Sequence, residues 1–179
     1  MNRCKWCNLK NNKYVDYHDK EWGILNTSDE YLYEMFILET FQAGLSWECI
    51  LNKREYFKSA YDNFDIDKII LYDEDKINSL LNNEKIIRNK NKIVSSINNS
   101  KIFKSIQKEY GSFYNYLSTF THGKVYYEVG KTTSKLSDDI SKDLNKRGMR
   151  FVGSITIYSY LQAIGIINSH EECCFLYKK

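Results

Sequence analysis

The sequence predicts an all-α fold, and three observations support this expectation. Proline is absent and only eight glycines occur among 179 residues, so few positions force the chain out of a helix. Most of the chain repeats its apolar residues with the period of a helix, and no internal repeat or low-complexity linker interrupts it. The last helical segment, residues 154–166, is apolar on nearly every side, which is typical of a helix buried at the centre of a bundle.

The first expected helix begins near residue 27. Thr27 and Glu30 have the spacing of a capping box, in which each side chain satisfies a backbone amide at the start of the helix. Apolar residues follow in helical period until Ala43 and Gly44 end the segment. The other helices are expected at residues 46–61, 75–81, 86–106, 112–120, 137–146 and 154–166, with a turn at Asn82 and Asn83 and an irregular stretch at residues 123–134.

Composition limits the class of protein. A chain that is 42% apolar and of this length buries about 70% of its unfolded surface, so it needs no disulfide framework. No stretch approaches the roughly 20 apolar residues of a membrane span, and residues 1–13 lack the apolar core of a secretion signal. We therefore expect a cytoplasmic monomer with no membrane partner.

Charge is unevenly distributed although the net charge is only +3. Residues 62–75 carry six acidic side chains and one lysine, whereas residues 85–104 carry six basic side chains and no acidic one. The basic stripe has two interpretations: a footprint for phosphate groups, or a solvated helix face.

The cysteines and histidines favour a metal site. The five cysteines are an odd number, and four of them lie near the chain ends, which in a reducing compartment favours a metal over disulfides. His170 and Cys174 are four residues apart, so one helical turn would present both to the same ion. Cys4 and His18 can complete a four-ligand site, which would leave zinc no open position and make it structural. Cys7 and Cys173 remain alternative ligands, and buried thiols with a surface histidine remain an alternative to any metal.

Glu39 is the second unusual feature. It follows Leu32, Met35 and Phe36 at the spacing of one buried helix face, where an ionised carboxylate needs a partner. The alternative is a glutamate near a helix end that reaches solvent. Trp47 follows shortly after, and further aromatic residues crowd the amino-terminal stretch, of which most are expected only to pack: Trp6, Tyr14, Tyr17 and Trp22.

Several motifs together resemble the bacterial 3-methyladenine DNA glycosylase I family. The match covers essentially the whole chain, in the order of that family. The motifs are Met1–Trp6, Tyr17–Gly23, Glu39 with Gln42–Trp47, Ile86–Arg88, Lys146–Gly153 and the terminal pair His170 and Cys174. The run Gln42-Ala43-Gly44-Leu45-Ser46-Trp47 is the most specific of them.

The resemblance implies a helix-hairpin-helix DNA glycosylase. Such an enzyme flips N3-methyladenine out of double-stranded alkylated DNA and hydrolyses its bond to deoxyribose, which releases free 3-methyladenine and initiates base excision repair. It would be monofunctional, with no covalent intermediate and no strand cleavage. The implied architecture is a helical core at residues 27–164 and a small terminal subdomain, residues 1–26 and 165–179, closed by one structural zinc. By position the zinc ligands are Cys4, His18, His170 and Cys174.

The resemblance also assigns roles in a base pocket. Glu39 matches the carboxylate that reads the adenine edge, and Trp47 is expected to stack on the cationic methylated purine. Tyr17 matches another wall, and Trp6, Tyr14 and Trp22 are further candidates. The expected mechanism is attack by water, helped by orientation and by electrostatic complementarity to the departing base.

DNA contacts are expected from three segments. The corner Gln42-Ala43-Gly44-Leu45 could insert Leu45 into the gap left by the flipped base, although a buried leucine is the alternative. A hairpin near residues 78–88 would hold phosphate on backbone amides. The cationic contacts expected beside this hairpin are Arg88, Lys90 and Lys92. The third segment is the turn at Gly148, which carries Arg147 and Arg150.

The chain departs from the family pattern at three places. Lys85 stands where a glycine is usual, Ser118 stands where a tryptophan is frequent, and residues 123–134 are short and lack the customary proline. These changes are expected to affect efficiency and substrate breadth more than reaction class. Three other functions stay open: a DNA-binding protein without activity, a glycosylase for 3-methylguanine or 7-methylguanine, and a helical zinc protein for free purines.

Overall fold

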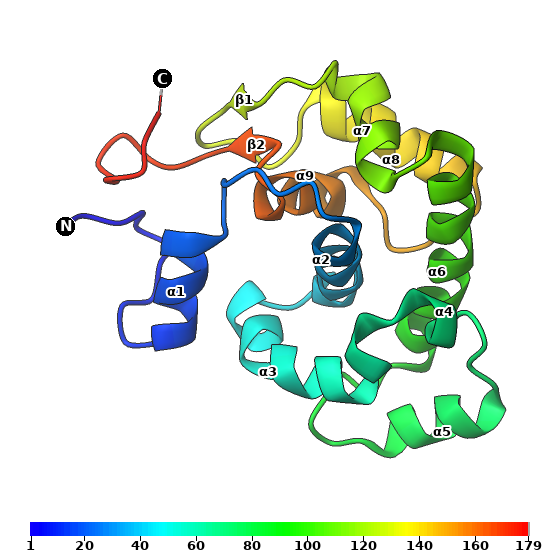
Figure 1. Cartoon of the computed structure of the whole chain (residues 1–179). Helices are drawn as coiled ribbons and strands as arrows, with labels where there is room; N and C mark the ends of the chain where they lie inside the picture. Colours follow the sequence, from blue (N-terminus) through cyan, green and yellow to red (C-terminus); the bar gives the residue numbers. More distant parts are fainter. Residues whose placement is uncertain (179) are drawn as a thin grey trace.

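A computed structural model describes residues 1–178 of the protein. These residues are mostly helical, as the sequence predicts (Figure 1). The elements are α1 (Asn12–Lys20), α2 (Asp29–Gln42), α3 (Trp47–Ala60), the 3₁₀ turn η1 (Asp62–Phe64), α4 (Ile66–Ile69), α5 (Glu74–Asn82), α6 (Lys90–Tyr110), α7 (Phe113–Thr121), β1 (Tyr126–Tyr127), α8 (Lys135–Lys146), α9 (Ser154–Ala163) and β2 (Ile167–Asn168). The only sheet in this part of the chain is the short parallel pair β1–β2, which the prediction of an all-α fold did not include. Among the residues that the structure describes, no helix is long and apolar enough to cross a membrane.

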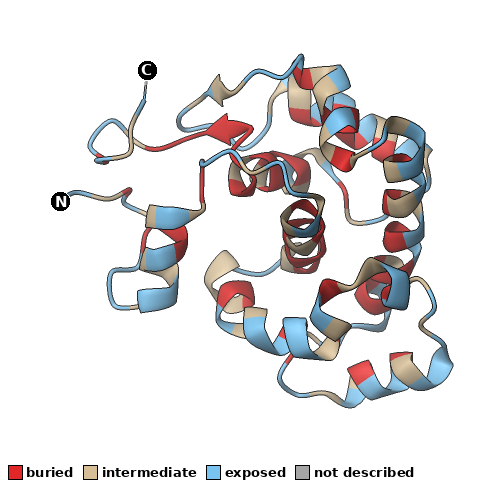
Figure 2. Cartoon of the chain, in the orientation of Figure 1, coloured by how far each residue is buried: buried red, intermediate tan, exposed pale blue. Residues whose placement is uncertain are grey.

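Helix α2 lies at the centre of the molecule. Nine of its 14 residues are buried, and α3, α6, α7 and α9 pack around it (Figures 1 and 2). Helix α9 packs between α2 and α8, and five of its 10 residues are buried, although its sequence predicts burial on nearly every side and Ile155 is 64% exposed. Residues 35–41 of α2 are all buried, so this part of the helix has no solvated face for a charged residue. Glu39, in the last turns of α2, is therefore forced into the interior.

The predicted capping box at Thr27 and Glu30 is wrong. Helix α2 begins at Asp29, and its N-cap is Ser28, whose side chain makes no capping bond. The Ser28 hydroxyl instead donates to the Glu30 carboxylate. With the helix start one residue later, Glu30 is the second helical residue and cannot occupy the third position that a capping box requires.

Other helix boundaries move because of local turn chemistry. Helix α6 starts at Lys90, since residues 83–86 form a turn, residues 87–89 are irregular and the Asn89 side chain caps the helix. Helix α8 starts at Lys135, where Ser134 and Ser137 form the true capping box. Helix α9 ends at Ala163, because Gly165 has a left-handed backbone with φ of 74°. The elements α1, η1 and α4 were not predicted.

The two chain ends lie side by side, on the same side of the molecule as α1 (Figure 1). The Phe175 amide donates to the Asn2 carbonyl at 2.9 Å. The segment after α1 is joined to α9, because the Gly23 amide donates to the Gln162 carbonyl at 2.9 Å and the Asn26 amide donates to the Ile164 carbonyl at 3.1 Å. Segments far apart in sequence thus build one wall of the molecule.

Gly165 sits where the amino-terminal segment crosses the end of α9. A Cβ there would lie within 2.3 Å of backbone atoms of Ile24 and Leu25. Gly165→Ala should therefore lower the free energy of unfolding in urea by about 4 kcal/mol or more, or prevent folding. Gly123→Ala is the matched control, because Gly123 also has a positive φ but no heavy atom within 4 Å of the added Cβ. It should cost only about 1–2 kcal/mol. Equal losses in the two variants would contradict this packing.

Candidate functional site

The six residues predicted to recognise a base line one cavity of about 500 Å³. They come from four segments: the chain before α1, α1 with the residues after it, the end of α2, and the start of α3. They are Trp6, Tyr14, Tyr17, Trp22, Glu39 and Trp47. Gln42, predicted as a DNA contact, lines the same cavity. A space of this size is in the range of small-molecule sites and holds a purine with room to spare.

Aromatic rings form the walls of the cavity. Tyr17, on α1, is 2% exposed, and its ring centroid lies 5.1 Å from that of Trp47. Trp6 and Trp22 meet edge to face at 4.6 Å, and Trp6 also contacts Tyr14 at 5.3 Å. Flat apolar walls of this kind suit a planar ring, and indole faces favour one that carries positive charge.

Glu39 and Trp47 each present an unpaired polar atom. Within residues 1–178, Glu39 Oε2 and Trp47 Nε1 are buried and have no hydrogen-bond partner. Buried polar groups nearly always have partners, so two orphans lining one cavity indicate that a polar ligand completes them. Burial raises the pKa of Glu39 to about 8. The carboxyl group is therefore held in its neutral form near neutral pH until a positive charge enters beside it.

The opposite wall was not predicted. It comes from the loop after β1, from α9 and from the chain after β2, and the added residues are Val129, Gly130, Lys131, Ser159, Gln162, Ser169 and Glu171. The Gln162 amide donates to the Ser169 hydroxyl at 2.7 Å, and Lys131 is paired with Glu128 at 3.2 Å. The only sequence signal for this wall was the irregular stretch at residues 123–134, which indicates a loop but not what it faces.

The corner between α2 and α3 lies next to the cavity. Gly44 has a φ of 79°, a conformation that favours glycine, and the Leu45 amide donates to the Gln42 carbonyl at 2.6 Å. The Leu45 side chain is 40% exposed, so it is not the buried leucine that the alternative interpretation required. The corner thus presents an apolar side chain to solvent beside the cavity.

The five predicted DNA-binding cations differ in their surroundings. Arg150 is exposed, and Arg88 and Lys90 are exposed with long contacts to acidic residues, at 3.6 and 3.8 Å. Arg147 is held by both Glu109 and Asp143. Lys92 is only 8% exposed and donates to backbone carbonyls. Lys92 is therefore engaged inside the protein and the partly exposed Arg147 is held in ion pairs, so the other three present the more readily available charges.

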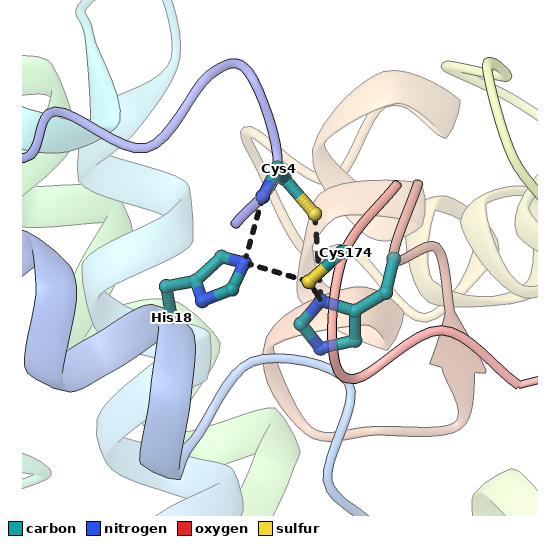
Figure 3. A group of neighbouring side chains, drawn as sticks. Cys4, His18 and Cys174 are labelled. Atoms are coloured by element: carbon teal, nitrogen blue, oxygen red, sulfur yellow. Dashed lines mark hydrogen bonds between the residues drawn. The ribbon is translucent and has the colours of Figure 1, made fainter. Parts of the chain in front are cut away.

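The residues Cys4, His18, His170 and Cys174 gather in one buried cluster (Figure 3). Their ligand atoms lie within 4.8 Å of one another, and the Cys174 sulfur is 3.5 Å from a nitrogen of each histidine. Ligand atoms around a tetrahedral zinc are about 3.3–3.8 Å apart. The cluster therefore has the donors and the spacing to hold a metal ion. Cys7 and Cys173 lie outside it.

The second nitrogen of each histidine is already engaged. His18 Nδ1 lies 2.8 Å from an Asp19 carboxylate oxygen, and His170 Nε2 lies 3.0 Å from the Trp22 carbonyl. These contacts orient His18 Nε2 and His170 Nδ1 toward the cluster, which is the usual arrangement around a metal. A hydrogen bond from Arg3 lowers the pKa of Asp19 to about 2, so this carboxylate stays charged. Because Trp22 also lines the cavity, the cluster and the cavity share a wall.

The raised pKa of Glu39 gives a test of its burial. The folded protein holds a proton on Glu39 between about pH 4.5 and pH 8, where the unfolded chain has lost it, so the free energy of unfolding should fall as pH rises through this window. Glu39→Gln has no charge to bury. Its free energy of unfolding in urea should match that of the wild type near pH 5 and exceed it near pH 9 by up to about 4 kcal/mol.

The control for this experiment is Glu55→Gln, at an exposed position on α3. Its stability relative to the wild type should not depend on pH over the same range. A difference between Glu39→Gln and the wild type that stays constant from pH 5 to pH 9 would contradict the placement of Glu39.

Known proteins resemble this chain in sequence and in fold. The chain matches the family model described as methyladenine glycosylase over residues 6–177. It is 36% identical to DNA-3-methyladenine glycosylase 1 of Escherichia coli (strain K12), over 99% of this chain and 97% of that protein. It is 33% identical to DNA-3-methyladenine glycosylase of Haemophilus influenzae, over 96% of each protein.

Solved structures agree with this assignment. A crystal structure of 3-methyladenine DNA glycosylase I superposes with a TM-score of 0.94 at 35% identity, over 99% of this chain and 100% of that one. A tyrosine-to-phenylalanine variant of 3-methyladenine DNA glycosylase I, in complex with 3-methyladenine, superposes with a TM-score of 0.93 at 29% identity, over 100% of this chain and 99% of that one. The resemblance of the motifs is thereby confirmed, and the chain belongs to the 3-methyladenine DNA glycosylase I family.

Proposed function

We propose that the protein excises N3-methyladenine from double-stranded alkylated DNA by hydrolysis, as a monofunctional glycosylase that initiates base excision repair and acts as a monomer. The observation that carries this proposal is the cavity in which an unpaired buried carboxyl group and aromatic rings face the same space. A base inside a duplex cannot reach such a cavity, so the nucleotide must swing out of the helix before it binds.

Charge is the basis of selection in this proposal. N3-methyladenine in DNA is positively charged, whereas undamaged adenine is neutral. A cation beside Glu39 lowers the pKa of the carboxyl group from about 8, so that the carboxylate forms and accepts hydrogen bonds from the exocyclic amine. A neutral purine leaves the carboxyl group protonated and gains no such ion pair. Stacking on Trp47 and Tyr17 adds a cation–π attraction that a neutral base lacks.

The bond broken is the one between N9 of the purine and C1′ of deoxyribose. Its electron pair moves to the purine and cancels the positive charge, so the leaving group is neutral 3-methyladenine. A water molecule adds to C1′ and releases a proton to solvent. The protein orients the nucleotide and stabilises the developing charge on the sugar, and no lysine forms a covalent intermediate. Lys131, the lysine that lines the cavity, is engaged by Glu128.

For DNA contact we propose the face that carries the corner and the start of α6. The turn before α6 would hold phosphate on backbone amides, with Arg88, Lys90 and Arg150 nearby. Gln42, Gly44 and Leu45 would enter the duplex at the gap left by the flipped base, because the corner is exposed and borders the cavity. Arg147 and Lys92 are left out of this set, since two carboxylates hold Arg147 and backbone carbonyls hold the buried Lys92.

For the Cys₂His₂ cluster we propose one structural zinc. Four protein ligands leave no position for water or substrate, so the metal would add no chemistry of its own. It would join residues 1–26 to residues 165–179 as one terminal subdomain beside the core at 27–164. The hydrogen bond between Asn2 and Phe175 and the shared ring contacts of His18, Trp22 and His170 support this division.

The first test is excision. Purified protein incubated with methylated duplex DNA should release 3-methyladenine, and borohydride should trap no adduct. Trp47→Ala should lower the rate about 10- to 100-fold, the effect of losing one stacked base contact, and Glu39→Gln should lower it by a similar factor. Tyr127→Ala and Glu55→Gln are the controls, because both side chains are exposed and line other surfaces. DNA bound without release of a base would leave only a DNA-binding role, and release of 3- or 7-methylguanine alone would change the substrate.

The second test is metal content. The purified protein should contain about one zinc per chain. The Cys174→Ser variant should lose this zinc, and its Tm should be about 10 °C below that of the wild type. Tryptophan fluorescence should change in the same variant, because Trp6 and Trp22 surround the cluster. Cys173→Ser is a matched control at the neighbouring exposed thiol and should keep the metal and the Tm. A metal-free wild-type protein with an unchanged Tm after chelation would rule out the zinc.

A further inference from the structure

Lys92 lies in the first turn of α6, immediately after the turn proposed to hold DNA phosphate. Its side chain does not reach solvent, since the residue is only 8% exposed. Nζ donates to the Phe41 carbonyl at 2.7 Å and to the Ala43 carbonyl at 2.6 Å. The Lys92 ammonium group thus binds the end of α2, about fifty residues earlier in the chain.

The end of α2 needs such a donor. The last carbonyls of a helix have no partner inside the helix, and together they form its negative end. Helix α2 ends at Gln42, and Ala43 leaves the helical conformation, so the carbonyls of Phe41 and Ala43 need a partner from outside the helix. A buried ammonium group costs free energy unless it is well bonded, and burial lowers the pKa of Lys92. The Phe151 ring, 5.8 Å from Nζ, adds a weak attraction.

The segment that Lys92 holds carries much of the site. Glu39 and Gln42 line the cavity from the last turns of α2, and Leu45 projects from the corner that follows. Trp47 begins α3 directly after this corner. A shift of the corner would therefore move the proposed wedge and the carboxyl group relative to the DNA.

Helix α6 holds a second loop of the same face. The Asn99 side chain accepts from the Arg150 amide at 2.9 Å and donates to the Arg150 carbonyl at 2.8 Å. Asn98 donates to the Gly148 carbonyl at 3.0 Å. The helix that follows the phosphate-binding turn thus fixes both neighbouring segments through side chains that bond to backbone, and Lys92 makes the contact to the corner.

We propose that Lys92 is a positioning residue for base extrusion: it fixes the corner that carries Leu45 against α6, so that the wedge and the phosphate-binding turn move as one rigid body. This inference rests on the proposed function, because it assumes that the corner enters DNA. It gives the buried lysine a role that differs from the phosphate contact expected from the sequence.

The test is Lys92→Met, which keeps the apolar stem and removes the donors. Single-turnover excision of 3-methyladenine from duplex DNA should slow about 10- to 100-fold, as expected when a reacting group is misplaced by about 1 Å. Binding of undamaged duplex should stay within about threefold of the wild type, with the same salt dependence, because no phosphate contact is removed. Lys90→Met is the matched control: it should weaken duplex binding and lower the salt slope by about one. A salt slope lowered by Lys92→Met would overturn the proposal.

A double-mutant cycle separates positioning from general destabilisation. If Lys92 acts through Leu45, then Leu45→Ala should slow excision little further in a Lys92→Met background, whereas independent effects would multiply. Multiplying effects would contradict the proposal. If the Met variant fails to fold, Lys92→Arg replaces it in the same cycle, because arginine keeps the donors and the charge in an altered geometry. Its loss of excision rate should be smaller, and its coupling to Leu45→Ala should be the same.

The outcomes also distinguish this inference from the proposed function. If the wild-type protein releases no methylated base, then the proposed function fails and the corner has no such role. If the wild type is active and Lys92→Met, at unchanged Tm, excises at the wild-type rate, then only the positioning role of Lys92 is wrong.

Discussion

The buried carboxyl group of Glu39 is the constraint on which the rest of the site depends. It lies on a helix surrounded by protein, its Oε2 has no partner within residues 1–178, and burial raises its pKa to about 8. Such a group lowers stability once it ionises, so its retention is explained by a ligand that supplies the missing charge and donors. A cationic methylated purine supplies both. In the proposed function the same physics would also discriminate against neutral adenine, because only the charged base makes the ionised carboxylate favourable.

The fold holds the surroundings of Glu39 from two sides. On one side, each histidine of the Cys₂His₂ cluster uses its second ring nitrogen for a contact outside the cluster, and the contact of His170 is to the Trp22 carbonyl at the cavity wall. On the other side, α6 holds the end of α2 through Lys92. Both supports join segments that are distant in sequence. The cavity is therefore a product of the tertiary structure rather than of one motif, and the segments that line it cannot shift independently.

Sequence reasoning found the parts of the site that leave a local signal. Glu39 stands out because it interrupts an apolar helix face, and His170 with Cys174 stand out by their spacing. The cavity wall at Gln162 and Ser169 leaves no such signal, because it depends on where α9 and the chain after β2 meet. The burial of Lys92 was also not predictable, since its partners lie in another helix and a lysine beside other basic residues normally reaches solvent. At helix ends, a shift of one residue was enough to make the capping box at Thr27 wrong.

The most direct measurement of the central claim is the titration of the Glu39 carboxyl group by NMR, with and without a purine in the cavity. In the empty cavity the carboxyl resonance should titrate with a pKa of about 8. An N3-methylated adenine that is also methylated at N9, and is therefore positively charged, should move this pKa to below neutrality, and neutral adenine should leave it high. A pKa near the ordinary value of 4.5 in the empty cavity, or equal shifts with the charged and the neutral purine, would contradict the account.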